Sequence, residues 1–179
     1  MKILGVDPGT LHCGFGIIEL NPSGKLSPIH YGLVNLTSLP SIPVKLEMIY
    51  TTLTELINKY NPEEFSIETA FYGKNVQSAL KIGLARGAAI LAARHHQLEI
   101  SEYSPREIKK AVVGNGAASK EQVVYMVRTL LSFGKQDLRF DEADALATAI
   151  CHAFRFKRGD VKPKSWKSFI ENFPERVVK

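Results

Sequence analysis

The chain has 179 residues, of which 45% are hydrophobic and 23% are charged. This length and balance predict one globular domain and are too small for two well-packed cores. Two cysteines, Cys13 and Cys151, cannot form a disulfide framework, so we expect inert thiols in a reducing compartment. Asp7 interrupts the first apolar run, and neither a signal peptide nor a membrane span is expected, which together predict a cytoplasmic protein.

The positive charge is concentrated at the C-terminal end of the sequence. The formal net charge is +5, and the sequence pI is about 9.2. Residues 157–179 carry seven Lys and Arg against three acids, a surplus of four, so residues 1–156 carry a surplus of one. We therefore divide the chain into a folded domain, 1–156, and a basic tail, 157–179. Such a tail suits a polyanion such as nucleic acid, although plain solvation is the commoner role of charged termini.

The chain begins with patterns typical of strands. Short apolar runs at 3–7, 14–20 and 29–36 are separated by turn signals rich in Pro, Gly and Asn, and they predict an antiparallel meander. Apolar residues then recur every three or four positions from Leu46 to Tyr60, which predicts an amphipathic helix.

Strands and helices alternate in the remainder of the domain. Strands are expected at 65–69 and 98–104, and helices at 76–95, 105–113, 120–131 and 141–156. This alternation predicts an α/β protein with a mixed sheet covered by helices on both faces. In such sheets, ligands bind at the carboxyl ends of the parallel strands.

Two acids end strands that should lie in the centre of this sheet. Asp7 follows the run ILGV, and Glu68 lies in the strand FSIET, so both are expected at the rim where the strands end. Asp7 alone is explained by a turn before the Pro-Gly pair that follows it. A buried Glu68 needs a cation or several donors, because desolvation disfavours its charged form, and Arg86 or Lys81 is an available partner.

A further group of acids opens the segment FDEADALATAI, whose Ala, Leu and Ile content is typical of a buried helix. On a helix Asp141 and Asp144 share one face, whereas Glu142 points about 100° away. One interpretation is structural: Asp141 is the N-cap, and Asp144 complements the helix dipole. The other is that both carboxylates face the rim that carries Asp7 and Glu68.

Four clustered carboxylates repel one another unless they are protonated or bind cations. Oxygen-only donors favour Mg²⁺, with Mn²⁺ able to substitute, and the sequence lacks the Cys/His spacing of a zinc site. His12 and Cys13 are adjacent but isolated from other such residues. Because paired Mg²⁺ ions held by carboxylates assist displacement at phosphorus, the cluster predicts phosphodiester hydrolysis.

Four motifs, GVDPGTLHCGFG, IETAFYGKN, SALKIGLARGAA and DEADALATAI, occur in the order and with the separations of one known family. From about Ile3 to Phe156 the sequence resembles the RuvC family of Holliday-junction resolvases, the crossover junction endodeoxyribonucleases of the ribonuclease H-like superfamily. The resemblance implies a ribonuclease H-like fold with a five-stranded mixed sheet of order 3-2-1-4-5, strand 2 being antiparallel. It also implies a homodimer that makes paired symmetric nicks in four-way DNA junctions, leaving 5′-phosphate and 3′-hydroxyl ends, during homologous recombination and repair. The RuvA-RuvB branch-migration complex is the partner that the resemblance implies.

The same resemblance assigns residues to the site. The implied catalytic and metal-binding acids exclude Glu142 and are Asp7, Glu68, Asp141 and Asp144. Phe71 matches an aromatic position that stacks on a base where the junction opens, whereas filling the core is its alternative role, and Tyr72 is left unassigned. Lys109 and Lys120 match basic positions beside the DNA cleft, although solvated helix ends would have the same sequence.

A stripe of small residues occurs on the long helix expected at 76–95. Ala79, Gly83 and Gly87 are spaced four residues apart and give a flat surface that permits close approach. Packing on the protein's own sheet and contact with a second subunit both fit this pattern.

Three other functions fit parts of the sequence. The Asp-Pro-Gly-Thr turn resembles the phosphate-binding hairpin of sugar kinases and actin, but those proteins need two such domains. A DNA-binding module with a decayed site would not need all four acids. A ribonuclease H-like nuclease acting on an RNA–DNA hybrid or a linear duplex would share the fold and the acids, since substrate choice depends on the groove.

Overall fold

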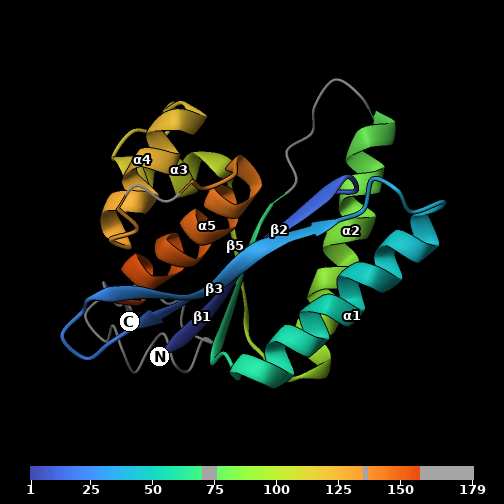
Figure 1. The fold of residues 1–179 in the computed structure, drawn as a ribbon, viewed down its shortest axis with the longest axis horizontal. Coiled ribbons are helices and arrows are strands. Elements are labelled where there is room, and N and C mark those ends of the chain that lie inside the picture. Colours follow the sequence, from blue (N-terminus) through green and yellow to red (C-terminus); the bar gives the residue numbers. More distant parts are fainter. Residues whose placement is uncertain (70–75, 135–136, 158–179) are drawn as a thin grey trace, which may run out of the picture.

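The computed structural model describes residues 1–69, 76–134 and 137–157, which form a five-stranded mixed sheet with helices on both faces (Figure 1). The strand order is β3-β2-β1-β4-β5, with β2 antiparallel to both neighbours and β1, β4 and β5 parallel, as predicted. The strands are β1 (Lys2–Asp7), β2 (His12–Leu20), β3 (Leu26–Asn35), β4 (Glu64–Glu68) and β5 (Ile100–Tyr103). The helices are α1 (Ile42–Tyr60), α2 (Val76–His95), α3 (Pro105–Val113), α4 (Lys120–Leu130) and α5 (Phe140–Lys157).

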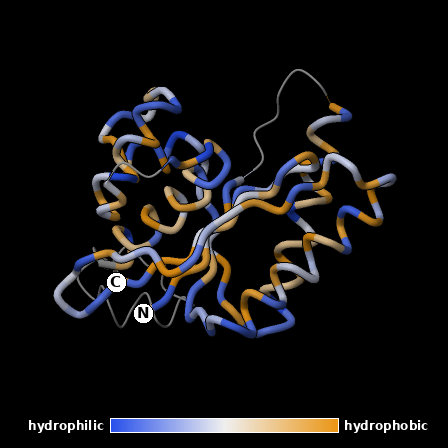
Figure 2. The backbone as a smooth tube through the Cα atoms, in the orientation of Figure 1, coloured by the Kyte–Doolittle hydropathy of each residue, from blue (hydrophilic) through white to orange (hydrophobic). Residues whose placement is uncertain are grey.

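The helices form two layers around the sheet. Helices α1 and α2 cover one face, while α5 lies on the other face with α3 and α4 packed against it (Figure 1). Each layer encloses an apolar core, one with Leu53 and Phe65 and the other with Leu146 and Ile150. Figure 2 shows hydrophobic residues along the central strands and mixed hydrophobic and hydrophilic residues along the helices. Burial of these apolar surfaces is the main source of stability for such a fold.

Helix α5 packs close to the strands because glycines of the strands face it. A Cβ atom added at Gly5 of β1 would overlap the carbonyl oxygen of Ala145 and would lie 2.7 Å from the amide nitrogen of Ala149. A Cβ atom added at Gly14 of β2 would overlap the carbonyl oxygen of Asp141. Close backbone approach of this kind is a common reason for glycine within a strand. It holds the first turn of α5 directly over the ends of β1 and β2.

Helix α2 has an exposed apolar side. Alanines make up its buried residues, whereas Leu80, Leu84 and Leu91 are 63%, 46% and 49% exposed. Gly83 and Gly87 are exposed as well, and nothing described lies within 4 Å of a Cβ atom added at either position. In the described residues, therefore, the two glycines do not pack on the sheet, and that interpretation of the small-residue stripe is wrong for them.

The length and composition of α2 alone would allow a membrane span. Its most apolar 18-residue window has a mean hydropathy of 1.2, contrary to the expectation that no segment would approach this range. In the fold, α2 packs against α1 along one face of the sheet (Figure 1). Core helices of folded domains often have this composition, so it is weak evidence for a membrane.

Several elements begin earlier than predicted, among them α1, β3 and α5. Helix α1 begins at Ile42, four residues before the first periodic apolar residue, with Ser41 as its N-cap and a proline in the first turn. Strand β3 begins at Leu26 and includes Pro28, which is tolerated because β3 is an edge strand and the pairing is irregular opposite this residue. Helix α5 begins at Phe140.

Candidate active site

Asp7 and Glu68 lie at the same rim of the sheet. Asp7 is the last residue of β1 and Glu68 is the last residue of β4, and these two strands pair in parallel. The carboxyl ends of adjacent parallel strands bring the two side chains together, as expected from the sequence. Their charges affect each other, because Asp7 is one of the groups that raise the pKa of Glu68.

The first turn of α5 brings two further carboxylates to this rim. Asp7 pairs across the sheet with Gly14, and the backbone of Asp141 packs directly over Gly14. The side chains of Asp141 and Asp144 are 35% and 22% exposed, and the charge of each raises the pKa of Asp7. Asp144 also raises the pKa of Glu68. The structure thus brings together the four acids that were predicted to form one cluster.

Burial is the main cause of altered protonation in this acid cluster. Burial, followed by the charges of Asp144 and Asp141, raises the pKa of Asp7 from 3.8 to about 7. Burial, followed by Asp7 and Asp144, raises the pKa of Glu68 from 4.5 to about 8. Burial also raises the pKa of Asp144, against the opposing charge of Lys120. Without a cation, the two acids at the strand ends therefore retain protons close to neutral pH.

Two lysines on separate helices lie beside the acid cluster. Lys120 is the first residue of α4, and its Nζ lies 3.6 Å from Oδ2 of Asp144. Lys109 of α3 lowers the pKa of both Glu68 and Asp144, so its charge is close to both groups. Each of these helices begins with a complete capping box, which fixes its first turn. Both lysines therefore place positive charge beside the acid cluster.

Glu142 has a structural role. Its Oε2 accepts a hydrogen bond of 2.9 Å from the backbone N–H of Arg139, and the Arg139 carbonyl accepts one from the N–H of Ala143. Asp141 lies inside the helix, which begins at Phe140. The interpretation of Asp141 as the N-cap is therefore wrong, because Arg139 and Glu142 complete the start of α5 instead. This agrees with the expectation that Glu142 does not belong to the acid cluster.

His12 is a neighbour of the acid cluster that the sequence analysis missed. Its Nδ1 lies 3.4 Å from Oδ2 of Asp141, and its side chain is 39% exposed. His12 is the first residue of β2, and the tight hairpin after Asp7 returns it to the rim. The sequence held one signal for this contact, the position of His12 on the hairpin that follows Asp7. Its neighbour Cys13 gives no such signal, because it is buried in the core.

Arg86, one of the two cations suggested as partners for Glu68, pairs elsewhere. Arg86 forms an ion pair with Glu102 of β5. Within the described ranges, neither Asp7 nor Glu68 forms an ion pair with a basic side chain. The positive charge that balances these two acids must therefore come from protons, from the more distant lysines, or from a bound cation.

The donor set fits a hard divalent cation. Four carboxylates from β1, β4 and α5 supply only oxygen ligands, which suit Mg²⁺ or Mn²⁺. Among residues 1–69, 76–134 and 137–157, no three His, Cys, Asp or Glu side chains already surround a position for an ion. A cation would replace the protons and the Lys120 contact as the compensating positive charge. The chemistry of the cluster therefore fits a metal, although its ligands are not already arranged around one.

Several other predicted residues can be placed. Burial raises the pKa of the Cys13 thiol to about 12 and that of Cys151 to about 11, in agreement with the expected inert thiols. Phe71 and Tyr72 lie outside the described residues, as does the tail from residue 158 onward.

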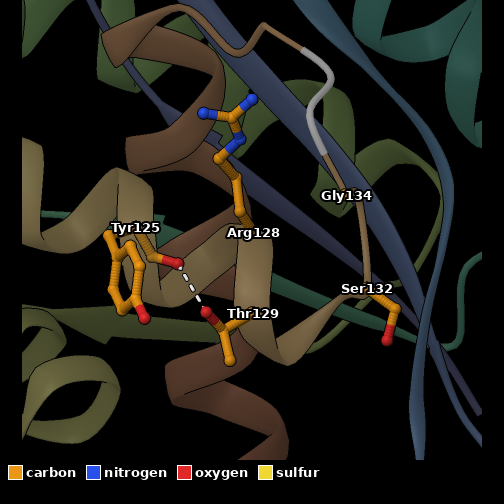
Figure 3. A pocket seen from close by; sticks show the side chains of 5 residues that line it. All are labelled: Tyr125, Arg128, Thr129, Ser132 and Gly134. Atoms are coloured by element: carbon orange, nitrogen blue, oxygen red, sulfur yellow. Dashed lines mark hydrogen bonds between the residues drawn. The ribbon is translucent and has the colours of Figure 1, made fainter.

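An open depression of about 690 Å³ lies at the C-terminal end of α4 (Figure 3). Its lining residues are Tyr125, Arg128, Thr129, Ser132 and Gly134. Figure 3 shows that Arg128 and Ser132 point away from Tyr125, and the Thr129 hydroxyl donates a hydrogen bond to the Tyr125 carbonyl. The side chains do not converge on a common point, and none of the predicted site residues lines this depression.

Comparison with known proteins agrees with this arrangement. Residues 3–152 match the family model described as crossover junction endodeoxyribonuclease RuvC. The chain is 43% identical to the crossover junction endodeoxyribonuclease RuvC of Chloroherpeton thalassium, with all of both chains covered. It is also 43% identical to that of Cytophaga hutchinsonii, with 98% of this chain and 87% of the relative covered.

Solved structures show the same similarity. Thermus thermophilus RuvC superposes with a TM-score of 0.81 at 31% identity, covering 89% of this chain and 97% of that one. The complex of T. thermophilus RuvC with a Holliday junction substrate superposes with a TM-score of 0.80 at 28% identity, with the same coverage. The sheet order and these matches establish the ribonuclease H-like fold. The chain therefore belongs to the RuvC family of crossover junction endodeoxyribonucleases.

Proposed function

We propose that this protein resolves four-way DNA junctions by hydrolysing phosphodiesters in two opposing strands, in homologous recombination and DNA repair. The observation that carries the proposal is the convergence of four carboxylates from β1, β4 and α5 beside Lys109 and Lys120. Junction DNA is favoured over an RNA–DNA hybrid because a relative of the same fold has been solved with a Holliday junction substrate. The products would carry 5′-phosphate and 3′-hydroxyl ends.

The four acids are the proposed metal ligands. Asp7, Glu68, Asp141 and Asp144 would hold Mg²⁺, with Mn²⁺ as a substitute, and a divalent cation bound there would supply activation of water and stabilisation of the leaving oxygen. The protein positions these ligands on the ends of two central strands and one closely packed helix. Because protons compete with a cation for Asp7 and Glu68, whose pKa values are raised to about 7 and about 8, metal affinity should rise with pH.

The basic residues would position the DNA strand. Lys109 and Lys120 lie close enough to the acids to affect their pKa values, so a phosphate bound by either lysine would lie close to the acid cluster. An ammonium group neutralises a phosphate and fixes its position without reading the base. Phe71 is the proposed base-stacking residue implied by the family resemblance.

We infer that the exposed side of α2 forms the contact of a homodimer. Leu80, Leu84 and Leu91 present apolar side chains around Gly83 and Gly87, and exposed apolar patches of this kind mark interaction sites. A twofold dimer presents two equivalent active sites, one for each strand of the junction. The RuvA-RuvB complex is the further proposed partner, and the surplus of positive charge in the sequence of residues 157–179 would suit a contact with DNA. All of these interactions would take place in the cytoplasm.

A gel assay of strand nicking tests the proposed function. The substrates are a synthetic four-way junction and a linear duplex of matched sequence, with Mg²⁺ or with EDTA. We expect paired nicks in the junction alone, and no nicks in EDTA. The variants Asp7→Asn, Glu68→Gln, Asp141→Asn and Asp144→Asn should each abolish nicking and spare junction binding. Glu142→Gln is the matched control on the same helix and should keep activity, because glutamine also completes a capping box. Equal cutting of duplex and junction would contradict the proposal.

A further inference from the structure

Phe140 presents an aromatic ring beside the acid cluster. It is the first residue of α5, immediately before Asp141, and it is 46% exposed. Ala143 and Leu146, in the following turns, are fully buried, so Phe140 stands outside the apolar core. A phenyl ring cannot cap a helix start, which favours small polar residues. Single exposed apolar residues are common, and what distinguishes this one is its surroundings.

Lys120 connects the ring to the acids. Its Nζ lies 5.7 Å from the centroid of the Phe140 ring and 3.6 Å from Oδ2 of Asp144. The side chain of Lys120 is 56% exposed, so both the ammonium group and the ring remain open to a ligand. A second exposed apolar residue, Leu11, is 61% exposed and precedes His12, which contacts Asp141. Apolar and cationic groups therefore border the same carboxylates.

This combination matches the chemistry of a nucleotide. An ammonium group binds a phosphate, whereas a phenyl ring gains nothing from a phosphate and instead suits the face of a base. A base within a continuous duplex is stacked on both sides and cannot offer its face to a protein ring. The ring would therefore act where bases are unstacked, as at the open centre of a four-way junction.

We propose that Phe140 is a DNA-contacting residue whose ring stacks on an unstacked base next to the phosphate that is cut, while Lys120 binds a phosphate of the same strand. The inference rests on the proposed function and deepens it, because it takes the four-way junction as the substrate. It adds a base contact on α5 to the one expected at Phe71.

The test uses the Asp7→Asn protein, which should bind junctions without cutting them. The probe is a four-way junction carrying 2-aminopurine at one position at a time around the point of strand exchange. We expect the fluorescence at one position to change on binding, and Phe140→Ala to abolish that change while weakening junction affinity about fivefold or more. Phe140→Trp should retain both signals. Phe156→Ala is the matched control, since Phe156 is 42% exposed near the opposite end of the same helix.

Salt dependence separates stacking from an indirect effect on Lys120. Lys120→Ala should lower the slope of log affinity against log salt by about one, the value for one lost phosphate contact, whereas Phe140→Ala should leave the slope unchanged. If the alanine variant does not fold, Phe140→Leu takes its place in the assay, because leucine keeps the apolar bulk. It should show the same loss of the fluorescence change.

Two results would overturn the inference. One is unchanged affinity and fluorescence in both Phe140→Ala and Phe140→Leu. The other is a fall in salt slope equal to that of Lys120→Ala, which would mean that the ring only positions the lysine. If the Asp7→Asn parent failed to prefer the junction over a duplex, the proposed function itself would be wrong.

Discussion

Neutralising Asp7 should stabilise the metal-free protein at alkaline pH. In the folded state the pKa of Asp7 is about 7, whereas 3.8 is the ordinary value that applies when the chain is unfolded. Between these values the folded state binds more protons than the unfolded state, so the free energy of unfolding falls as pH rises. The contribution of the ionisable Asp7 is therefore largest below pH 4 and is lost as pH rises towards 7.

The expected size follows from the same values. From pH 5 to pH 7, two pH units at about 1.4 kcal/mol each give an upper limit of about 3 kcal/mol lost by the wild type relative to Asp7→Asn. Glu68 is present in both proteins, but Asp7 is one of the groups that raise its pKa, so this part of the shift is lost in Asp7→Asn and adds to the difference in the same direction. Because the rim is partly open to solvent, we expect a difference of about 1–3 kcal/mol.

Urea denaturation in EDTA at pH 5 and pH 8, for wild type and Asp7→Asn, measures this difference. The advantage of Asp7→Asn should grow between the two pH values. Saturating Mg²⁺ should reverse it at pH 8, because a cation that binds only the folded wild type adds about 2.7 kcal/mol at one hundred times its Kd. A gap between the two proteins that does not change with pH would refute the claim that Asp7 is buried among like charges.

Three further predictions concern the surroundings of the site. Gly5→Ala should lower the free energy of unfolding by about 1–3 kcal/mol or more in urea denaturation, because its Cβ would overlap the α5 backbone, and unchanged stability would contradict the close packing of α5. Leu84→Asp should convert a dimer to a folded monomer in sedimentation experiments, whereas Tyr125→Asp on α4, 69% exposed, should not; a persistent dimer would exclude the α2 contact. Lys109→Ala should weaken junction binding and reduce the slope of log affinity against log salt by about one. Lys110→Ala, at the next and exposed position, should have the smaller effect, and equal effects of the two variants would mean that Lys109 is only a solvated surface residue.

Local pattern was sufficient for most of the fold. The bounds of α2 and α3 match the predicted ranges 76–95 and 105–113, and α3 in particular has local signals at both ends, a capping box at Ser104 and a glycine cap at Gly114. The closeness of Asp7 and Glu68 also followed from sequence, since both end parallel strands that pair in the sheet. Family resemblance added the strand order and the choice of the four acids.

Contacts between distant segments could not be predicted in this way. The 3.4 Å approach of His12 to Asp141 depends on how α5 crosses the β1–β2 hairpin, and no local pattern encodes that crossing. Helix α5 begins at Phe140, one residue earlier than predicted. For this reason the backbone N–H before the helix, that of Arg139, is bonded by Glu142, and Asp141 is not the N-cap. The exposure of Gly83 and Gly87 on α2 could not be predicted from the sequence either, because the stripe has the same sequence whether it faces the sheet or a second subunit.

The most direct test of the proposed metal site is anomalous diffraction from crystals soaked in Mn²⁺. The account predicts an anomalous peak at the rim of the sheet, in contact with the carboxylates of Asp7 and Glu68 and close to Asp144, and the loss of that peak in Asp7→Asn. A protein that nicks junctions in Mn²⁺ but shows its anomalous peak elsewhere, or shows the same peak in Asp7→Asn, would contradict the assignment of these acids as the metal ligands.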